Sequence, residues 1–159
     1  MDSNSKDIGR EKDAAKKYQQ QLQKAITAFS GYFMNNTKWR VVFKVLCFEH
    51  PETCCMVKLI GEDTSRKVNL FIKRERFEQC FLSYYLADNI IFGCGPIAYK
   101  EIERLEFPKH QEFKRINRNE VLTPLIKKYD TDIIKEDLEK IGTFEFEETE
   151  DKLMLIGYR

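Results

Sequence analysis

Four large apolar residues, spaced like one face of a helix, constrain the fold of this chain more than any other feature. The residues at positions i, i+3, i+4 and i+7 of this face are Trp39, Val42, Phe43 and Leu46. This spacing places the four side chains on one side of an α-helix. Asn36 or Thr37 is expected to cap the start of the helix. Pro51 is expected to end it, because the residue before a proline avoids the helical conformation. We therefore predict structural roles for Asn36, Thr37 and Trp39, with Trp39 anchored in a core.

A second apolar stripe, near the N-terminus, predicts a helix of about twenty residues over 11–29. Its members are Tyr18, Leu22, Ala25, Ile26 and Phe29. Residues 1–9 are polar and are expected to lie outside this helix, and Gly31 is expected to end it. The stripe is expected to dock on the remainder of the chain. The alternative is a contact between two copies of the chain through Tyr18, Leu22, Ile26 and Phe29.

The centre and C-terminus of the chain predict strands with a few flanking helices. Residues 53–60 and 66–74 are expected to form a hairpin around Gly61, residues 99–107 a strand, and residues 143–159 a second hairpin. Residues 74–87 fit a helix, with a strand as the alternative. Residues 117–142 predict two short helices, the second capped by Asp130, Thr131 or Asp132. The apolar face expected for the first of these helices is Val121, Leu122, Leu125 and Ile126. The fold class is therefore α+β, a single domain with a mainly antiparallel sheet.

Composition and charge exclude several classes of function. The 27 basic residues nearly balance the 26 acidic ones, which argues against the broad basic field of most nucleic-acid binders or membrane-surface proteins. The first residues are charged where a secretory signal peptide would be apolar, and no apolar run approaches membrane-spanning length. We therefore expect a cytoplasmic protein. Its five cysteines, an odd number, are expected to be reduced thiols, and the sequon at 35–37 is expected to stay unglycosylated.

No catalytic, metal-binding or cofactor motif is evident in the sequence. The cysteines and the two histidines lack the spacing of a zinc site, and no glycine-rich segment matches a phosphate-binding loop. No cofactor and no metal are therefore predicted. Cys94, between two glycines, is the one candidate thiol nucleophile, with His50 or His110 as its base. A turn shaped by the glycines is the favoured interpretation of that segment.

Two charged segments are candidates for binding a partner. The acidic segment near the C-terminus could meet a basic protein surface and comprises Glu145, Glu147, Glu148, Glu150 and Asp151. The basic segment with interleaved aromatic residues could bind single-stranded nucleic acid. Its residues are Arg66, Lys67, Lys73, Arg74, Arg76 and Phe77, with Phe71 between them. A solvated hairpin rim would have the same composition, so binding of nucleic acid is the less favoured alternative.

Three sequence blocks resemble a small bacterial family of unknown function. They are NNTKW at 35–39, GPIAYKEIERLEFP at 95–108 and EETEDKLMLIGYR at the C-terminus. The resemblance spans about residues 34–159, which makes residues 1–33 a helical extension of an α+β domain. This chain departs from the family pattern in having Arg104 where an aromatic residue is usual. The resemblance implies a compact bacterial α+β domain and no particular chemistry.

These observations favour a cytoplasmic protein that binds another protein and is not an enzyme. Small size, missing catalytic motifs and the acidic C-terminal segment are the grounds for this hypothesis. A toxin-neutralising (immunity) protein is its narrower form. The alternatives are a single-stranded nucleic-acid binder acting through residues 66–77, and a thiol enzyme acting through Cys94.

Overall fold

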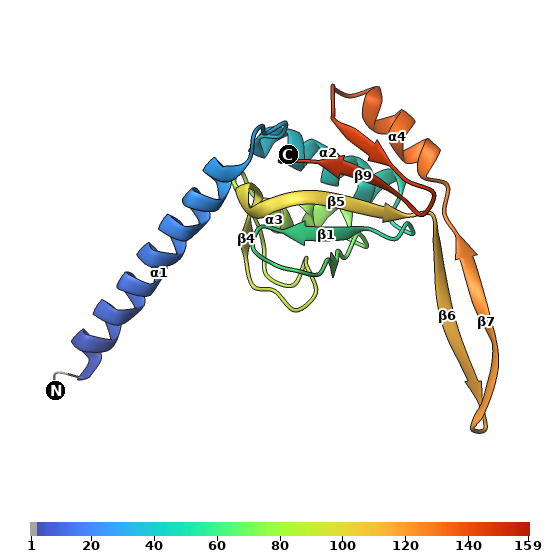
Figure 1. Cartoon of the computed structure of the whole chain (residues 1–159), viewed down its shortest axis with the longest axis horizontal. Coiled ribbons are helices and arrows are strands. Elements are labelled where there is room, and N and C mark those ends of the chain that lie inside the picture. The colour runs from blue at the N-terminus through green and yellow to red at the C-terminus, as the bar shows by residue number, and fades with distance from the viewer. Residues whose placement is uncertain (1–2) are drawn as a thin grey trace.

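Helix α2 and a five-stranded antiparallel sheet are the main elements of the body (Figure 1). A layer of apolar side chains between them is the core of the protein. The computed structural model describes the backbone of residues 3–159 and the side chains from residue 7 onward. The sheet has the strand order β2-β1-β5-β9-β8. Its strands are β1 (Met56–Leu59), β2 (Arg66–Lys67), β5 (Ile102–Pro108), β8 (Phe146–Glu148) and β9 (Lys152–Ile156). The α+β class with a mainly antiparallel sheet and a C-terminal hairpin is confirmed.

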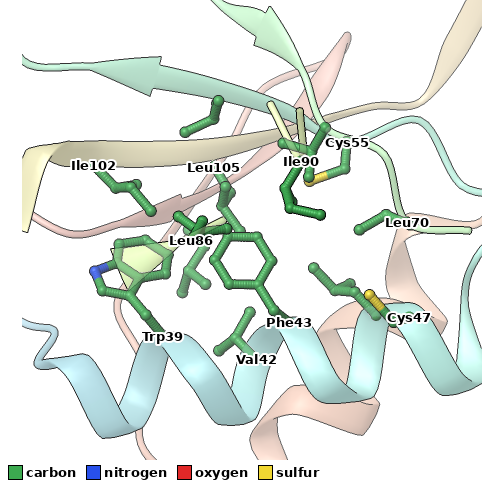
Figure 2. Close-up of a cluster of buried hydrophobic side chains, with 14 of the residues drawn as sticks. Trp39, Val42, Phe43, Cys47, Cys55, Leu70, Leu86, Ile90, Ile102 and Leu105 are labelled. Atoms are coloured by element: carbon green, nitrogen blue, oxygen red, sulfur yellow. The ribbon is translucent and has the colours of Figure 1, made fainter. Parts of the chain in front are cut away.

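Helix α2 (Asn36–Glu49) lies across the inner face of this sheet. Figure 2 shows Trp39, Val42 and Phe43 pointing from the helix toward the strands above it. Trp39 is only 2% exposed, and Val42 and Phe43 are fully buried. The strands contribute alternate residues, because Val57, Leu105 and Leu155 stand opposite one another across β1, β5 and β9. Helix α4 (Thr131–Glu139) packs beside α2 and adds Ile134 and Leu138 to the same core.

The N-terminal cap of α2 is Asn35, neither Asn36 nor Thr37 as the sequence suggested. Asn35 has an extended backbone, and its side-chain oxygen accepts a hydrogen bond from the N–H of Lys38 at 2.8 Å. Asn36 is already the first helical residue, and Thr37 is exposed. Both alternatives were one or two residues late, because three successive polar residues all favour the cap position.

Replacing the cap should destabilise the protein, whereas replacing its neighbour should not. Asn35→Ala leaves the N–H of Lys38 without its partner and is expected to lower the free energy of unfolding by about 1 kcal/mol. Thr37→Ala is the matched control and should stay within about 0.5 kcal/mol of the parent protein. Urea unfolding of both variants measures the difference. A larger loss from Thr37→Ala would contradict this assignment of the cap.

Helix α1 (Ser3–Ala28) docks on the body through its C-terminal part and extends away from it at the other end (Figure 1). Leu22 is buried, Phe29 stacks on Tyr158 with ring centroids 5.1 Å apart, and the Tyr18 hydroxyl donates a hydrogen bond to Glu101. Burial of Tyr18 and its bond to Glu101 raise the pKa of this tyrosine to about 12. The expected docking of the stripe on the same chain is therefore what the structure contains. The helix begins at Ser3, so residues 3–9 are helical rather than frayed.

The segment over residues 74–87 is irregular instead of forming one helix. A 3-10 turn (Arg74–Arg76) leads into the single turn of α3 (Phe77–Cys80), and strand β3 (Tyr85–Leu86) pairs with β4 (Ile97–Ala98). The rings of Phe77 and Phe81 stack inside the core with centroids 4.7 Å apart. A second 3-10 turn (Tyr99–Glu101) precedes β5. After the single turn of α3 the chain extends to pair with β4, which leaves Tyr84 exposed and buries Leu86.

The larger error concerns residues 117–142, where the first of two expected helices is a strand. Strand β7 (Glu120–Lys128) pairs antiparallel with β6 (His110–Asn117), while α4 follows from its cap, Asp130, as predicted. Arg118 and Asn119 adopt left-handed backbone angles, with φ of 49° and 68°. Two such residues in succession close a tight hairpin between strands. Pro124 would also break a helix at this point, so turn geometry and proline outweigh the helix-like apolar spacing.

The outer face of the sheet carries a network of buried and half-buried ion pairs. Glu106, which is 7% exposed, accepts hydrogen bonds from Ser65, Lys152 and Arg104 at 2.8 to 3.2 Å. Lys58 pairs with Glu103 at 3.0 Å. Burial alone would raise the pKa of Glu106, but these hydrogen bonds outweigh it and hold the pKa below its ordinary value.

A lowered pKa makes Glu106 a source of stability that acid removes. Because its folded pKa lies below its unfolded one, the contribution is complete at neutral pH and is lost as the pH falls through the folded value. Glu106→Gln should therefore cost about 1 to 2 kcal/mol at pH 7. The difference from the parent protein should shrink once the pH drops below the ordinary value of 4.5. Urea unfolding at several pH values tests this, with the exposed Glu150→Gln as control; a gap that stays constant down to pH 3 would be the contrary result.

Candidate functional site

The most distinctive surface of the protein is the hairpin of β6 and β7, hereafter the arm (residues 110–128). It projects from the body as a free two-stranded ribbon (Figure 1). Every residue of its two strands is exposed except the half-buried Gln111. None of its residues belongs to the hydrophobic core. An isolated two-stranded hairpin is only marginally stable in water. A ribbon of this length is therefore expected to be stabilised by contact with another molecule.

Apolar side chains stand on both faces of the arm. Residues opposite each other in an antiparallel pair share a face. On one face Phe113 lies opposite Leu125, with Leu122 further toward the tip. On the other face Ile116 lies opposite Val121, and Ile126 lies nearer the base. Ile116 and Val121 are 71% and 83% exposed, which is unusual for β-branched residues in a strand.

The arm is also the basic part of an otherwise balanced chain. Between residues 110 and 128 there are five basic side chains and two acidic ones, Glu112 and Glu120, a net charge of +3. The basic residues are Lys114, Arg115, Arg118, Lys127 and Lys128. The whole protein carries a net charge of only +1, so the body without the arm is slightly acidic. A surface that is apolar and basic fits an apolar surface with an acidic rim.

The base of the arm is fixed to the body. The N–H of Lys109 donates to the carbonyl of Asp151 at 2.8 Å, and the Lys109 ammonium pairs with Glu148 at 2.8 Å. The Tyr129 hydroxyl donates to Gln111 at 3.0 Å. Beside this base is an open hollow between the end of α2 and the start of α4, lined by His50, Glu52, Lys128, Tyr129 and Ile133 among others. The arm therefore leaves the body in a defined direction.

The two edges of the arm differ. The N–H of Tyr129 donates to the carbonyl of Lys109 at 2.8 Å. Hydrogen bonding alternates along an antiparallel pair, so Gln111 and Phe113 bond to β7 while the backbone groups of Glu112 and Lys114 face outward. On β7 the same alternation turns position 124 outward. That position is a proline beside a break in the register, and proline has no N–H to offer a further strand. The β7 edge is thus blunted and the β6 edge is open.

The acidic C-terminal segment is largely paired within the chain. Glu145 and Glu147 both bind the guanidinium of Arg159, at 3.0 and 2.5 Å, and Glu148 binds Lys109. The Lys109 ammonium lowers the pKa of Glu148. Glu150 and Asp151 are exposed at the turn between β8 and β9. The structure thus leaves a smaller acidic surface than the five carboxylates of the sequence suggested.

The basic segment at 66–77 does not assemble into a stacking surface. Phe77 is 2% exposed and belongs to the core, so its ring cannot meet a base. Arg66 is held by Glu62, and the Arg74 guanidinium lies over the Phe48 ring at 4.4 Å. Lys67, Lys73 and Arg76 remain exposed, as does Phe71. The expected role of Phe77 is therefore wrong, whereas the ring of Phe71 is exposed.

Cys94 lies in a turn next to Gly93, whose φ of 76° is one that glycine adopts readily. Partial burial raises the pKa of the Cys94 thiol, although the nearby Arg66 acts in the opposite direction. His50 is engaged by Asp137 at 2.7 Å, and in the described part of the chain no hydrogen bond joins either histidine to Cys94. A raised pKa keeps the thiol protonated at neutral pH, so this geometry lends a thiol mechanism no support.

Among residues 7–159, no three His, Cys, Asp or Glu side chains gather closely enough to hold a metal ion. None of the helices in the described chain combines the length and apolar content needed to cross a bilayer.

Comparison with protein-family models, with curated proteins and with solved structures found no match to this chain. The resemblance to a bacterial family of unknown function therefore stays a prediction from its three sequence blocks.

The arm was missed at the sequence level, although its signal was present. Arg118-Asn119 joins two runs that each mix β-branched and charged residues, and a two-residue connection of this kind is typical of a hairpin. The apolar spacing of residues 121–126 fits a helix equally well, since short segments satisfy both periods. The ion pairs of Lys109 with Glu148 and of Lys152 with Glu106 could not be foreseen, because the partners are distant in sequence.

Removing the arm should leave the body folded. Gln111 and Lys127 lie opposite each other near the base and form a hydrogen-bonded pair of the ladder, so Asn-Gly in place of residues 112–126 would close the gap with a two-residue hairpin turn. Because the arm adds nothing to the core, the thermal midpoint of the shortened protein is expected within about 5 °C of the parent value. Circular dichroism on heating measures it. A shortened protein that is unfolded at 25 °C would show that the arm supports the body.

Proposed function

We propose that this protein is a binding protein without catalytic activity, and that it holds another protein through the arm. The observation that carries the proposal is the exposure of apolar side chains on both faces of a ribbon that stands clear of the body. Contiguous exposed apolar surface is typical of interaction sites. The contact proposed here is with the arm, instead of with the acidic C-terminal segment that the sequence favoured.

The chemistry of the arm defines the partner. Ile116 and Val121 at its far end would enter an apolar groove, while Arg118 and the base lysines would meet carboxylates at the rim. Apolar anchors supply most of the affinity of such contacts, and the charges steer the encounter. We therefore infer an acidic protein surface with an apolar groove. The narrower form of this proposal is that the protein neutralises a toxin. We also propose that it acts in the cytoplasm.

A photo-reactive amino acid placed on the arm tests the proposal in the native cell. At Val121 it should form an adduct with one partner protein, whereas at Tyr84, an exposed residue of the body, it should not. The double variant Ile116→Asp/Val121→Asp should weaken binding of the identified partner at least about tenfold, because two apolar anchors are lost. Ile8→Asp, an exposed apolar residue on α1, is the matched control.

Each other outcome of this experiment has a clear meaning. Equal cross-linking from Tyr84 and Val121, or none from Val121, would refute the proposed role of the arm. Adducts of Val121 with RNA would show that the arm binds nucleic acid instead of a protein. Growth rescue by co-expression of this protein with the identified partner would support the toxin-neutralising form, and a harmless partner would exclude it.

A further inference from the structure

We propose that two copies of this chain pair through the outer edge of β6, antiparallel and centred on Phe113, so that their arms form one four-stranded sheet. This pairing is independent of the partner protein proposed above. It rests on three observations: one open edge, a self-complementary charge pattern on that edge, and a ribbon too narrow to be stable alone.

The open edge is specific to β6. The strand sequence HQEFKRIN contains neither proline nor glycine, and the backbone N–H and C=O groups of Glu112 and Lys114 face away from β7. No hydrogen bond within the described chain occupies these outward groups. An unpaired strand edge is a template for another strand. On β7, by contrast, Pro124 and the register break at Thr123–Pro124 prevent regular addition.

The charges on this edge select one register. Charged side chains on an edge strand normally discourage pairing. A two-fold axis normal to the sheet would relate the two copies of β6, so that facing side chains lie on the same face of the sheet. The axis passes beside one residue, which then faces its own copy. Near the middle of the strand this central residue is Glu112, Phe113 or Lys114. Centring on Glu112 or on Lys114 would set like charges against each other. Centring on Phe113 sets each Glu112 against Lys114 of the second copy, twice.

The same register satisfies the backbone and the apolar side chains. The backbone N–H and C=O groups of Glu112 and Lys114 both point to the outer edge. Glu112 of one copy and Lys114 of the other can therefore exchange both backbone hydrogen bonds, as the bonded pairs of an antiparallel ladder do. Phe113 meets Phe113 of the second copy on the face that already holds Leu122 and Leu125. The resulting sheet has four strands, which exceeds the number at which a sheet with an apolar face is stable on its own. Its two faces stay free to receive a partner.

Sedimentation equilibrium of the full chain tests the pairing. The parent protein should form dimers within a range of about 1 to 200 µM, since a contact along one strand edge lies at the small end of stable interfaces. Glu112→Lys alone, or Lys114→Glu alone, should weaken the dimer at least about tenfold, because each sets like charges opposite each other twice. The double swap Glu112→Lys/Lys114→Glu restores opposite charges and should restore the dimer. Lys128→Glu, on the blunted edge, is the control and should leave dimerisation unchanged.

A disulfide across the two-fold axis tests the register itself. The two copies of Phe113 would face each other as a non-hydrogen-bonded pair. The Cα atoms of such a pair are about 4.5 Å apart, within the range of a disulfide. In a Cys94→Ser background, which leaves only buried cysteines, Phe113→Cys should give a covalent dimer on mild oxidation. Leu125→Cys on β7 lies on the same face but away from the axis and should not.

The pairing is overturned by a parent protein that stays monomeric over the whole range, or by a dimer that persists in both single charge variants. A double swap that fails to restore the dimer, or a covalent dimer from Leu125→Cys alone, would overturn the register. A parent dimer with the expected charge dependence would support the pairing even if the cross-linker at Val121 captured no partner protein. Failure of this inference and failure of the proposed function are therefore distinguishable.

Discussion

The packing of α2 against the inner face of the sheet is the contact on which the rest of the structure depends. Trp39 and Phe43 fill the space under β5 and β9, and the chain approaches so closely at Gly157 that a Cβ there would lie 2.9 Å from both the Trp39 ring and the Glu103 carbonyl. The N–H of Gly157 donates to that same carbonyl at 2.8 Å. The close packing of Trp39 and Gly157 with strands β5 and β9 thus fixes the helix against the sheet. α1 and the arm, by contrast, extend from this body.

The distribution of burial separates structure from proposed function. The side chains that hold the fold are nearly all inside the layer between α2 and the sheet, or in the ion pairs around Glu106 on its outer face. The arm contributes to neither. A segment that costs chain entropy to order and adds nothing to the core is expected to gain its stability from a contact outside the body. This is the physical reason for placing the binding site on the arm.

The sequence predicted the body better than it predicted the arm. Helix α2, the antiparallel sheet and the C-terminal hairpin follow from periodic apolar residues and their boundaries, and the structure contains them all. The arm was misjudged because Val121, Leu122, Leu125 and Ile126 fit a helical face, while the left-handed turn at Arg118-Asn119 and Pro124 favour a hairpin. The pairing of Arg159 with Glu145 and Glu147, and the burial of Phe77, depend on tertiary contacts that local patterns do not contain.

The central claim is that β6 presents an open edge that another strand covers. Amide hydrogen exchange at two protein concentrations measures this most directly. Raising the concentration into the dimer range should slow exchange at the outward amides of Glu112 and Lys114, and should leave the outward amides of β7 and the core amides of α2 unchanged. Exchange at Glu112 and Lys114 that stays equally fast at every concentration, or protection that arises on β7 instead, would contradict the account.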